Sequence, residues 1–235
     1  MRYAIYYTPP EHAPLTRIAS SWLARSAFGG DCPAPRHASH MPATEIAFHT
    51  AAARRYGFHA TLMAPFTLAE RETGDALIAS LAAFCRTARP VILPRLELRR
   101  LDGFFALMPK AQNLELSALA DLIVATFDRF RAPLSESQSA RRAASSLAPS
   151  QLRNLMRWGY PYVFEDFRFH MTLTGRVDEA DATRVRRAIE EHFGSLLEEG
   201  IEIASLALFL EPEPGAPFIV RSYHEFGAAA ERRSA

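Results

Sequence analysis

Two stretches of the sequence repeat the pattern His-x-Thr-Leu, at residues 59–62 and 170–173. In each stretch the histidine and the threonine are two residues apart, so on a β-strand their side chains point to the same face. Imidazole has an unperturbed pKa of about 6.5 and can accept or donate a proton near neutral pH. A threonine hydroxyl can donate a hydrogen bond to an oxygen on which negative charge develops. The pattern therefore selects His59, Thr61, His170 and Thr172.

Two such pairs suit the opening of a cyclic phosphodiester by water. That reaction needs one group that takes a proton from the water and another that gives a proton to the leaving alkoxide. We expect His59 and His170 to fill these catalytic roles, and Thr61 and Thr172 to bind the phosphate, with no metal ion or other cofactor. The sequence does not distinguish the base from the acid. One copy of the motif would indicate little, because a single strand histidine is more often structural, so the prediction depends on the repetition.

The surroundings of the two motifs repeat as well. Residues 56–66 and 167–177 have strand-like patterns, each followed by a helical pattern and then by two strand-like runs joined at a turn. We interpret this as a divergent duplication with pseudo-repeat units of about 1–110 and 111–228 in a single bilobal domain. The predicted helices are 74–86 and 181–193, and the predicted strand pairs are 91–100 with 104–108 and 201–210 with 218–223.

The remaining chain predicts a strand at residues 2–7, helices at 15–27, 113–131 and 150–158, and a further helix leading to Arg54 and Arg55. We expect the polar stretch 133–146 to be an exposed connector rather than a flap over the site. We expect residues 229–235 to form a disordered tail.

Composition limits the partners. Of 235 residues, 49% are hydrophobic and 23% charged, which fits one large domain or two closely packed lobes. The 27 Lys and Arg against 26 Asp and Glu argue against binding of long nucleic acid, which needs a basic excess. The sequence shows neither an apolar run of membrane-spanning length nor a secretory signal, so we expect a cytoplasmic protein without membrane contact. The oligomeric state is not predicted.

The two motifs, their flanks and the duplication resemble the 2H phosphoesterase superfamily, which includes RNA 2′-5′ ligase-like proteins and cyclic nucleotide phosphodiesterases. The strings RYAIYYTPP, YGFHATLMAPF and RWGYPYVFEDFRFHMTLTGR are similar to the branch associated with phosphonate-degradation operons. The resemblance covers residues 2–226. It implies an α+β fold, bilobal and pseudo-two-fold duplicated, with two antiparallel sheets flanked by helices around a central cleft. It also implies the same four catalytic residues and, for this branch of phosphonate metabolism, a ribose cyclic phosphate as substrate.

Several other residues have both a functional and a structural interpretation. Arg168 lies two residues before His170 and either binds phosphate or forms a surface ion pair. Tyr56 has the opposite strand parity to His59, which favours packing over substrate binding. Residues 158–162 (WGYPY) either stack on a base or, as we favour, pack in the core or form a rigid turn. Arg54 and Arg55 either steer an anion or are a solvated helix end, the simpler interpretation.

Four more histidines, His12, His49, His192 and His224, lack a repeated context, and we interpret them as structural. Cys32, His37 and His40 have a spacing that could bind metal, but no fourth ligand is evident and we expect no metal site there.

Two other functions use the same residues. One is a noncatalytic module that binds a nucleotide or sugar phosphate. The other is an RNA-end-processing enzyme acting on 2′,3′-cyclic or 2′-5′ phosphodiesters, against which the neutral charge counts modestly. The presence of two proton-transfer groups favours the enzyme over the module, because binding alone does not require them.

Overall fold

The computed structural model describes residues 1–29, 32, 37–38, 41–135, 147–197 and 199–227. The strands are β1 (Arg2–Tyr7), β2 (His37–Ala38), β3 (Met41–Pro42), β4 (Ala60–Phe66), β5 (Val91–Leu93), β6 (Leu96–Leu101), β7 (Phe104–Pro109), β8 (Met171–Arg176), β9 (Ile201–Ile203), β10 (Ser205–Glu211) and β11 (Ile219–Glu225). Seven of them form one antiparallel sheet in the order β11-β10-β1-β4-β8-β7-β6, and β2-β3 and β5-β9 form two-stranded pairs.

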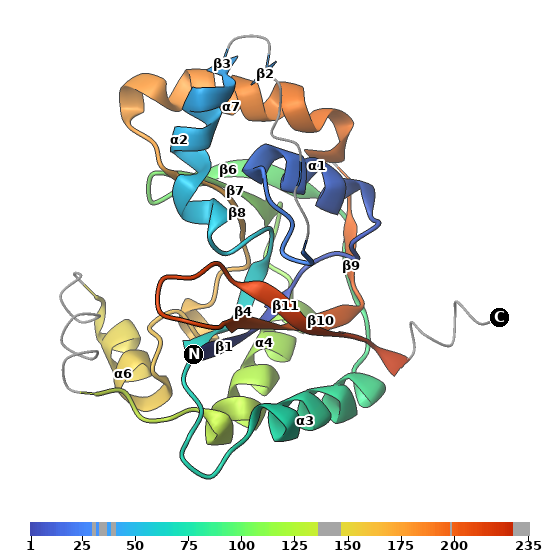
Figure 1. The fold of residues 1–235 in the computed structure, drawn as a ribbon, viewed down its shortest axis with the longest axis vertical. Coiled ribbons are helices and arrows are strands. Elements are labelled where there is room, and N and C mark those ends of the chain that lie inside the picture. Colours follow the sequence, from blue (N-terminus) through green and yellow to red (C-terminus); the bar gives the residue numbers. More distant parts are fainter. Residues whose placement is uncertain (30–31, 33–36, 39–40, 136–146, 198, 228–235) are drawn as a thin grey trace.

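The helices lie in two groups, one for each end of the sheet. They are α1 (Pro14–Leu23), α2 (Ala43–Arg54), α3 (Gly74–Thr87), α4 (Leu114–Phe127), α6 (Pro149–Trp158) and α7 (Glu179–Phe193). Helices α3 and α4 pack on the β1-β4-β10-β11 end, and α1 and α2, with α7 against α1, cover the end that contains β8 (Figure 1). The molecule therefore has two lobes, each with its own helical layer.

The two lobes meet at a single pair of residues. Strands β4 and β8 pair antiparallel through Ala60 and Met171, and this pair joins the two ends into one sheet. The α+β class and the antiparallel strands flanked by helices are confirmed. The two expected sheets are connected edge to edge at the place where the two His-x-Thr motifs lie.

The repeated order of elements is strand, helix, short strand and hairpin: β4-α3-β5-β6-β7, and then β8-α7-β9-β10-β11. The hairpins are exchanged in space. Hairpin β6-β7 extends the sheet from β8, whereas hairpin β10-β11 lies beyond β1 on the side of β4. Each lobe thus combines a motif strand from one part of the chain with a hairpin from the other.

The boundaries differ from the predicted ones where local chemistry interrupts a pattern. Strands β4 and β8 begin at Ala60 and Met171, so each motif histidine immediately precedes its strand. The predicted strands 91–100 and 201–210 are each two strands, β5 with β6 and β9 with β10. Most of the polar stretch 133–146, and the tail 229–235, lie outside the described residues. Among the residues that the structure describes, no helix is long and apolar enough to cross a membrane.

Strand β1 is buried on both faces, which matters for the site. Ile5 and Tyr7 belong to the main core, whereas Ala4 and Tyr6 belong to a second, smaller cluster with Phe209. A strand with both faces covered loses the alternation of polar and apolar residues. The second cluster forms one wall of the space between the lobes.

Candidate active site

The pairing of β4 with β8 brings the two motifs together. In an antiparallel pair, the neighbours of two opposed residues are themselves opposed. Because Ala60 faces Met171, His59 lies opposite Thr172, and Thr61 lies opposite His170. Ala60 and Met171 are fully buried on the core face, so the four motif side chains share the other face. The structure therefore brings all four predicted residues together around a local two-fold.

A cleft lies above this crossing, in two adjoining chambers. The first, here called the His59 chamber, has a volume of about 520 Å³ and is lined by His59, Thr61 and Thr172 among others. The second, the His170 chamber, has about 600 Å³ and is lined by His170 and again by Thr61. Both are of the size that holds small ligands. Five residues border both chambers: Thr61, Phe104, Tyr160, Tyr162 and Arg176.

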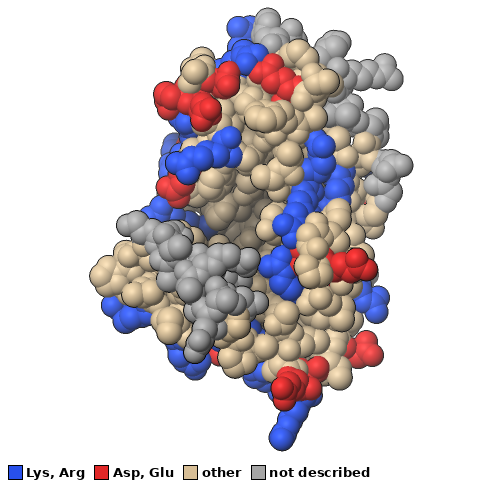
Figure 2. Space-filling view, turned by 60° about the vertical axis from the view of Figure 1, so that its left-hand side comes forward, with Lys and Arg blue, Asp and Glu red and all other residues tan. Residues whose placement is uncertain are grey.

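The surface view shows this hollow between the lobes (Figure 2). Lys and Arg side chains lie on both of its sides, while the atoms on its floor belong to neither charged class. A small anionic ligand would therefore meet favourable charge at the rim and polar, uncharged groups below.

The same hydrogen bond orients both imidazoles. His59 Nδ1 lies 2.9 Å from the carbonyl oxygen of Gly57, and His170 Nδ1 lies 2.7 Å from that of Arg168. A backbone carbonyl can only accept, so Nδ1 of each neutral ring carries the hydrogen and Nε2 is the free base. His59 Nε2 lies 3.3 Å from Thr61 Oγ1, which can donate to it. Each ring thus presents its Nε2 as the group for proton transfer.

Gly57 has a local reason to be glycine. Its φ is +76°, and a Cβ there would lie 2.7 Å from the Cβ of Ala27. The turn aims the Gly57 carbonyl at His59, and the Thr8 hydroxyl fixes the following residue by donating to the Phe58 carbonyl at 2.8 Å. The first motif is therefore held by backbone geometry that other residues would strain.

The two imidazoles differ in their surroundings. His59 is 9% exposed, and its ring stacks on that of Tyr6 with centroids 4.0 Å apart. His170 is only partly buried, with the Phe104 ring centroid at 5.6 Å. Burial lowers the pKa of His59 to about 4, with His170 adding to the effect and the Gly57 carbonyl opposing it. Burial also lowers the pKa of His170, against the Arg168 carbonyl and Asp102.

The two further candidates for substrate binding also border the cleft. Arg168 is exposed in the His170 chamber and, within the described part of the chain, has no carboxylate partner, so the predicted alternative of an ion pair is wrong. Tyr56 lines the His59 chamber, 5.9 Å from the His59 ring, and stacks on Phe218. The parity argument against Tyr56 fails because the strand begins only at Ala60.

Several cleft residues were not predicted. Arg176 borders both chambers, and it has the same strand parity as His170 and Thr172, a signal that the sequence did contain. Tyr160 and Tyr162 also line the cleft, which corrects the preference for core packing or a rigid turn in that segment. The others are Tyr6, Phe104 and Asp102.

Other candidates lie outside the cleft or serve the fold. Arg54 donates to the Leu23 carbonyl at 2.7 Å, and Arg55 pairs with the buried Glu211, so neither is a free helix end. His192 and His224 are hydrogen-bonded to the Ile18 carbonyl and to Ser222, as structural residues are. For the predicted cluster of Cys32, His37 and His40, the two histidine side chains lie outside the described residues.

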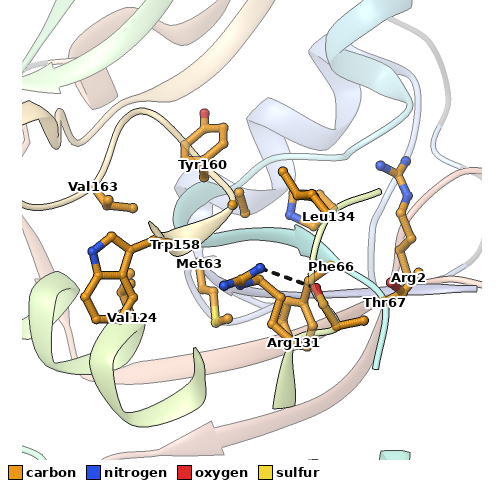
Figure 3. A pocket seen from close by; sticks show the side chains of 14 residues that line it. Arg2, Met63, Phe66, Thr67, Val124, Arg131, Leu134, Trp158, Tyr160 and Val163 are labelled. Carbon is orange, nitrogen blue, oxygen red and sulfur yellow. Dashed lines mark hydrogen bonds between the residues drawn. The ribbon is translucent and has the colours of Figure 1, made fainter. Parts of the chain in front are cut away.

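A smaller pocket adjoins the cleft behind Tyr160 (Figure 3). It has a volume of about 40 Å³, with Met63, Phe66, Val124 and Trp158 among its walls. Arg131 lies beside it and donates to the Ala132 carbonyl at 3.3 Å. This space is too small for a sugar phosphate and contains no motif residue, so the two-chambered cleft is the candidate site.

Fold and site together define a two-lobed α+β protein with one His-x-Thr motif at each of two adjoining strands, the arrangement that the resemblance to the 2H phosphoesterases implied. A family model described as "Protein of unknown function (DUF1045)" matches residues 61–219, and the chain belongs to this family.

Two curated relatives are both named ribose 1,5-bisphosphate phosphokinase PhnN. The one from Janthinobacterium sp. (strain Marseille) is 38% identical over 237 residues, covering 99% of this chain and 52% of the relative. The one from Laribacter hongkongensis (strain HLHK9) is 38% identical over 219 residues, covering 93% and 50%. The chain therefore spans about half the length of these relatives.

Two solved structures are similar over nearly the whole chain. Escherichia coli LigT complexed with 3′-AMP has 13% identity and a TM-score of 0.44, with 96% of this chain and 97% of that chain covered. TT0787 of Thermus thermophilus has 15% identity and a TM-score of 0.44, with 97% and 98% covered.

Proposed function

We propose that this protein is a metal-independent phosphoesterase that opens a cyclic phosphodiester by general acid and base catalysis with His59 and His170. The observation that carries the proposal is the pairing of Ala60 with Met171. It sets two imidazoles and two hydroxyls on one face, in a cleft of ligand size. Binding alone would not require two free Nε2 atoms directed at one space, whereas proton transfer to and from a phosphodiester does.

The reaction uses one imidazole at each end of the displacement. The neutral ring takes a proton from water through Nε2 while the water oxygen forms a bond to phosphorus. The bond between phosphorus and one ring oxygen breaks, and that oxygen receives the Nε2 proton of the second, protonated imidazole. The product is a phosphomonoester with one freed hydroxyl. Thr61 and Thr172 donate hydrogen bonds to the nonbridging oxygens, where charge increases in the transition state.

A ribose cyclic phosphate, formed in phosphonate metabolism, is the substrate that we favour. The chain matches about half of proteins whose name concerns ribose 1,5-bisphosphate. Kinase chemistry does not suit this half, because its only lysine is Lys110 and the sequence has no glycine-rich loop of the form G-x-x-x-x-G-K. We assign the phosphokinase activity to the part of the relatives that this chain does not span.

The test is a phosphorus NMR screen of cyclic phosphates with wild type and His59→Ala, in the presence of a chelator. We include ribose cyclic phosphates and 2′,3′-cyclic nucleotides. Conversion to a monoester by wild type and its loss in the variant would support the proposal. Equal turnover by a correctly folded His59→Ala/His170→Ala double variant, or activity that chelator removes, would contradict it.

A second candidate is a nucleotide substrate, as an RNA-end-processing enzyme would use. The observation in its favour is the pair of tyrosines at the cleft, Tyr160 and Tyr162, whose ring centroids lie 5.5 Å apart. Tyrosine rings can stack on a base. Faster turnover of a 2′,3′-cyclic nucleotide than of a ribose cyclic phosphate would favour this candidate. Tight binding without conversion across the whole panel would instead indicate a noncatalytic module.

A further inference from the structure

The local two-fold of the site relates two positions with very different side chains. In one lobe, Tyr6 of β1 is the residue paired with Thr61. In the other lobe, Ala106 of β7 is the residue paired with Thr172. Each lies beside its motif threonine on the strand that flanks the crossing. A large aromatic ring thus occupies one half of the site where the other half has a methyl group.

The Tyr6 ring lies directly against His59. The two rings are stacked, with centroids 4.0 Å apart and planes inclined by 24°. Phe209 supports Tyr6 from behind, with centroids 4.9 Å apart, and the Tyr6 side chain is 1% exposed. The Tyr6 hydroxyl also makes a hydrogen bond with the Thr61 side chain. One residue therefore contacts both members of the first motif.

We propose that Tyr6 is a positioning residue that aligns His59 and shields it from water, and so commits this imidazole to the role of the base. The proposal rests on the proposed function for the word base, but the shielding itself does not. His170 has Ala106 in place of a ring at the related position, remains partly open to solvent, and supplies the proton to the leaving oxygen. The duplicated site is thereby divided into one base and one acid.

The charged groups around each imidazole agree with this division. Around His59 the neighbours are uncharged hydroxyls and rings, and burial raises the pKa of the Tyr6 hydroxyl well above its usual value, so it stays protonated. Around His170, Asp102 favours the protonated ring. The titratable and charged groups that share its chamber are Asp102, Tyr160, Tyr162, Asp166, Arg168 and Arg176.

The experiment is a titration of the histidine ring signals by NMR in wild type, Tyr6→Phe and Tyr6→Leu. We expect His59 to stay neutral down to about pH 4 in wild type. Tyr6→Phe keeps the ring and should leave this titration in place. Tyr6→Leu admits water, and the His59 pKa should rise by roughly one unit or more toward its ordinary value. His170 should titrate alike in all three proteins.

The same variants should change the pH profile of turnover. If the pKa of the base rises from about 4 to roughly 5.5, kcat of Tyr6→Leu falls about fourfold at pH 5 and little at pH 7.5. Tyr7 provides the matched control, since it lies on the same strand, is equally buried and faces the other way, toward the Glu202 carbonyl. Tyr7→Leu should cost stability without moving either the titration or the acidic limb.

The outcomes separate the two proposals. If Tyr6→Leu leaves the His59 titration unchanged, or if Tyr7→Leu shifts it equally, Tyr6 is only a core residue and the inference is wrong. If the titration shifts but no cyclic phosphate is ever opened, the shielding stands and the proposed function fails. If the shift moves the alkaline limb instead of the acidic one, His59 is the acid and the assignment of roles is reversed.

Discussion

The His59 half and the His170 half of the cleft share a backbone and differ in what surrounds it. Both rings bind the carbonyl two residues earlier, and both precede a strand that pairs at the crossing. The first ring is enclosed by Tyr6, whereas the second faces a chamber that contains Asp102 and two arginines. Duplication thus supplies equal geometry, and the neighbouring strands make the two imidazoles chemically unequal, which is what an acid and base pair requires.

The largest effect should come from removing either imidazole. His59→Ala and His170→Ala should each reduce kcat about 10³-fold, because each deletes one proton transfer. The double variant should lose little more, since the two groups act in one step. Steady-state kinetics checks this, with circular dichroism to verify folding. His224→Ala, which removes a ring hydrogen-bonded to Ser222 outside the cleft, is the matched control. A loss of less than tenfold in either single variant would break the comparison.

The second prediction concerns stability against pH. The pKa of His59 falls from 6.5 in the unfolded chain to about 4 in the folded protein, so the folded state holds the proton less readily. The stability that depends on neutral His59 is complete above pH 6.5 and is lost as the pH falls toward 4, by about 3 kcal/mol.

Urea unfolding at pH 7.5 and pH 4, with wild type and His59→Asn, measures this loss as the part of the pH dependence that the variant lacks. His170→Asn should remove a smaller part, because His170 is more open and Asp102 favours its charged form. An equal contribution from the two histidines would contradict the difference between the two halves.

The two threonines should be more nearly equal than the histidines. Thr61→Val and Thr172→Val keep the branched shape that suits a strand but remove the hydroxyl. Each should lower kcat about 10²-fold, the usual effect of losing one donor to developing charge. Thr87→Val, at the end of α3, is the control and should have no effect on kcat. A change confined to KM would mean that the hydroxyls bind the ground state alone.

The sequence was sufficient for features that depend on spacing and insufficient for those that depend on a neighbour from elsewhere in the chain. The motif residues were predictable because parity places them on one face, and the same parity was available for Arg176. Tyr6 was not predictable, because β1 is buried on both faces and its alternation is lost. Tyr160 and Tyr162 reach the cleft from a loop, where neither helical nor strand periodicity applies. The exchange of hairpins between lobes also leaves no local pattern.

The smallest predicted effects concern the two arginines of the open half. Arg176 borders both chambers and Arg168 only the His170 chamber of the cleft, and both are exposed. Arg176→Gln should therefore raise KM roughly tenfold and Arg168→Gln only about threefold, since an exposed guanidinium contributes modestly to anion binding. Added salt should reduce the wild-type advantage, because screening weakens exposed charges most. Arg187→Gln, which removes an exposed charge paired with Glu191 on α7, should change neither KM nor its salt dependence. If Arg168→Gln has the larger effect, the substrate lies mainly on the His170 side, and the His59 chamber serves to position the base rather than to hold the ligand.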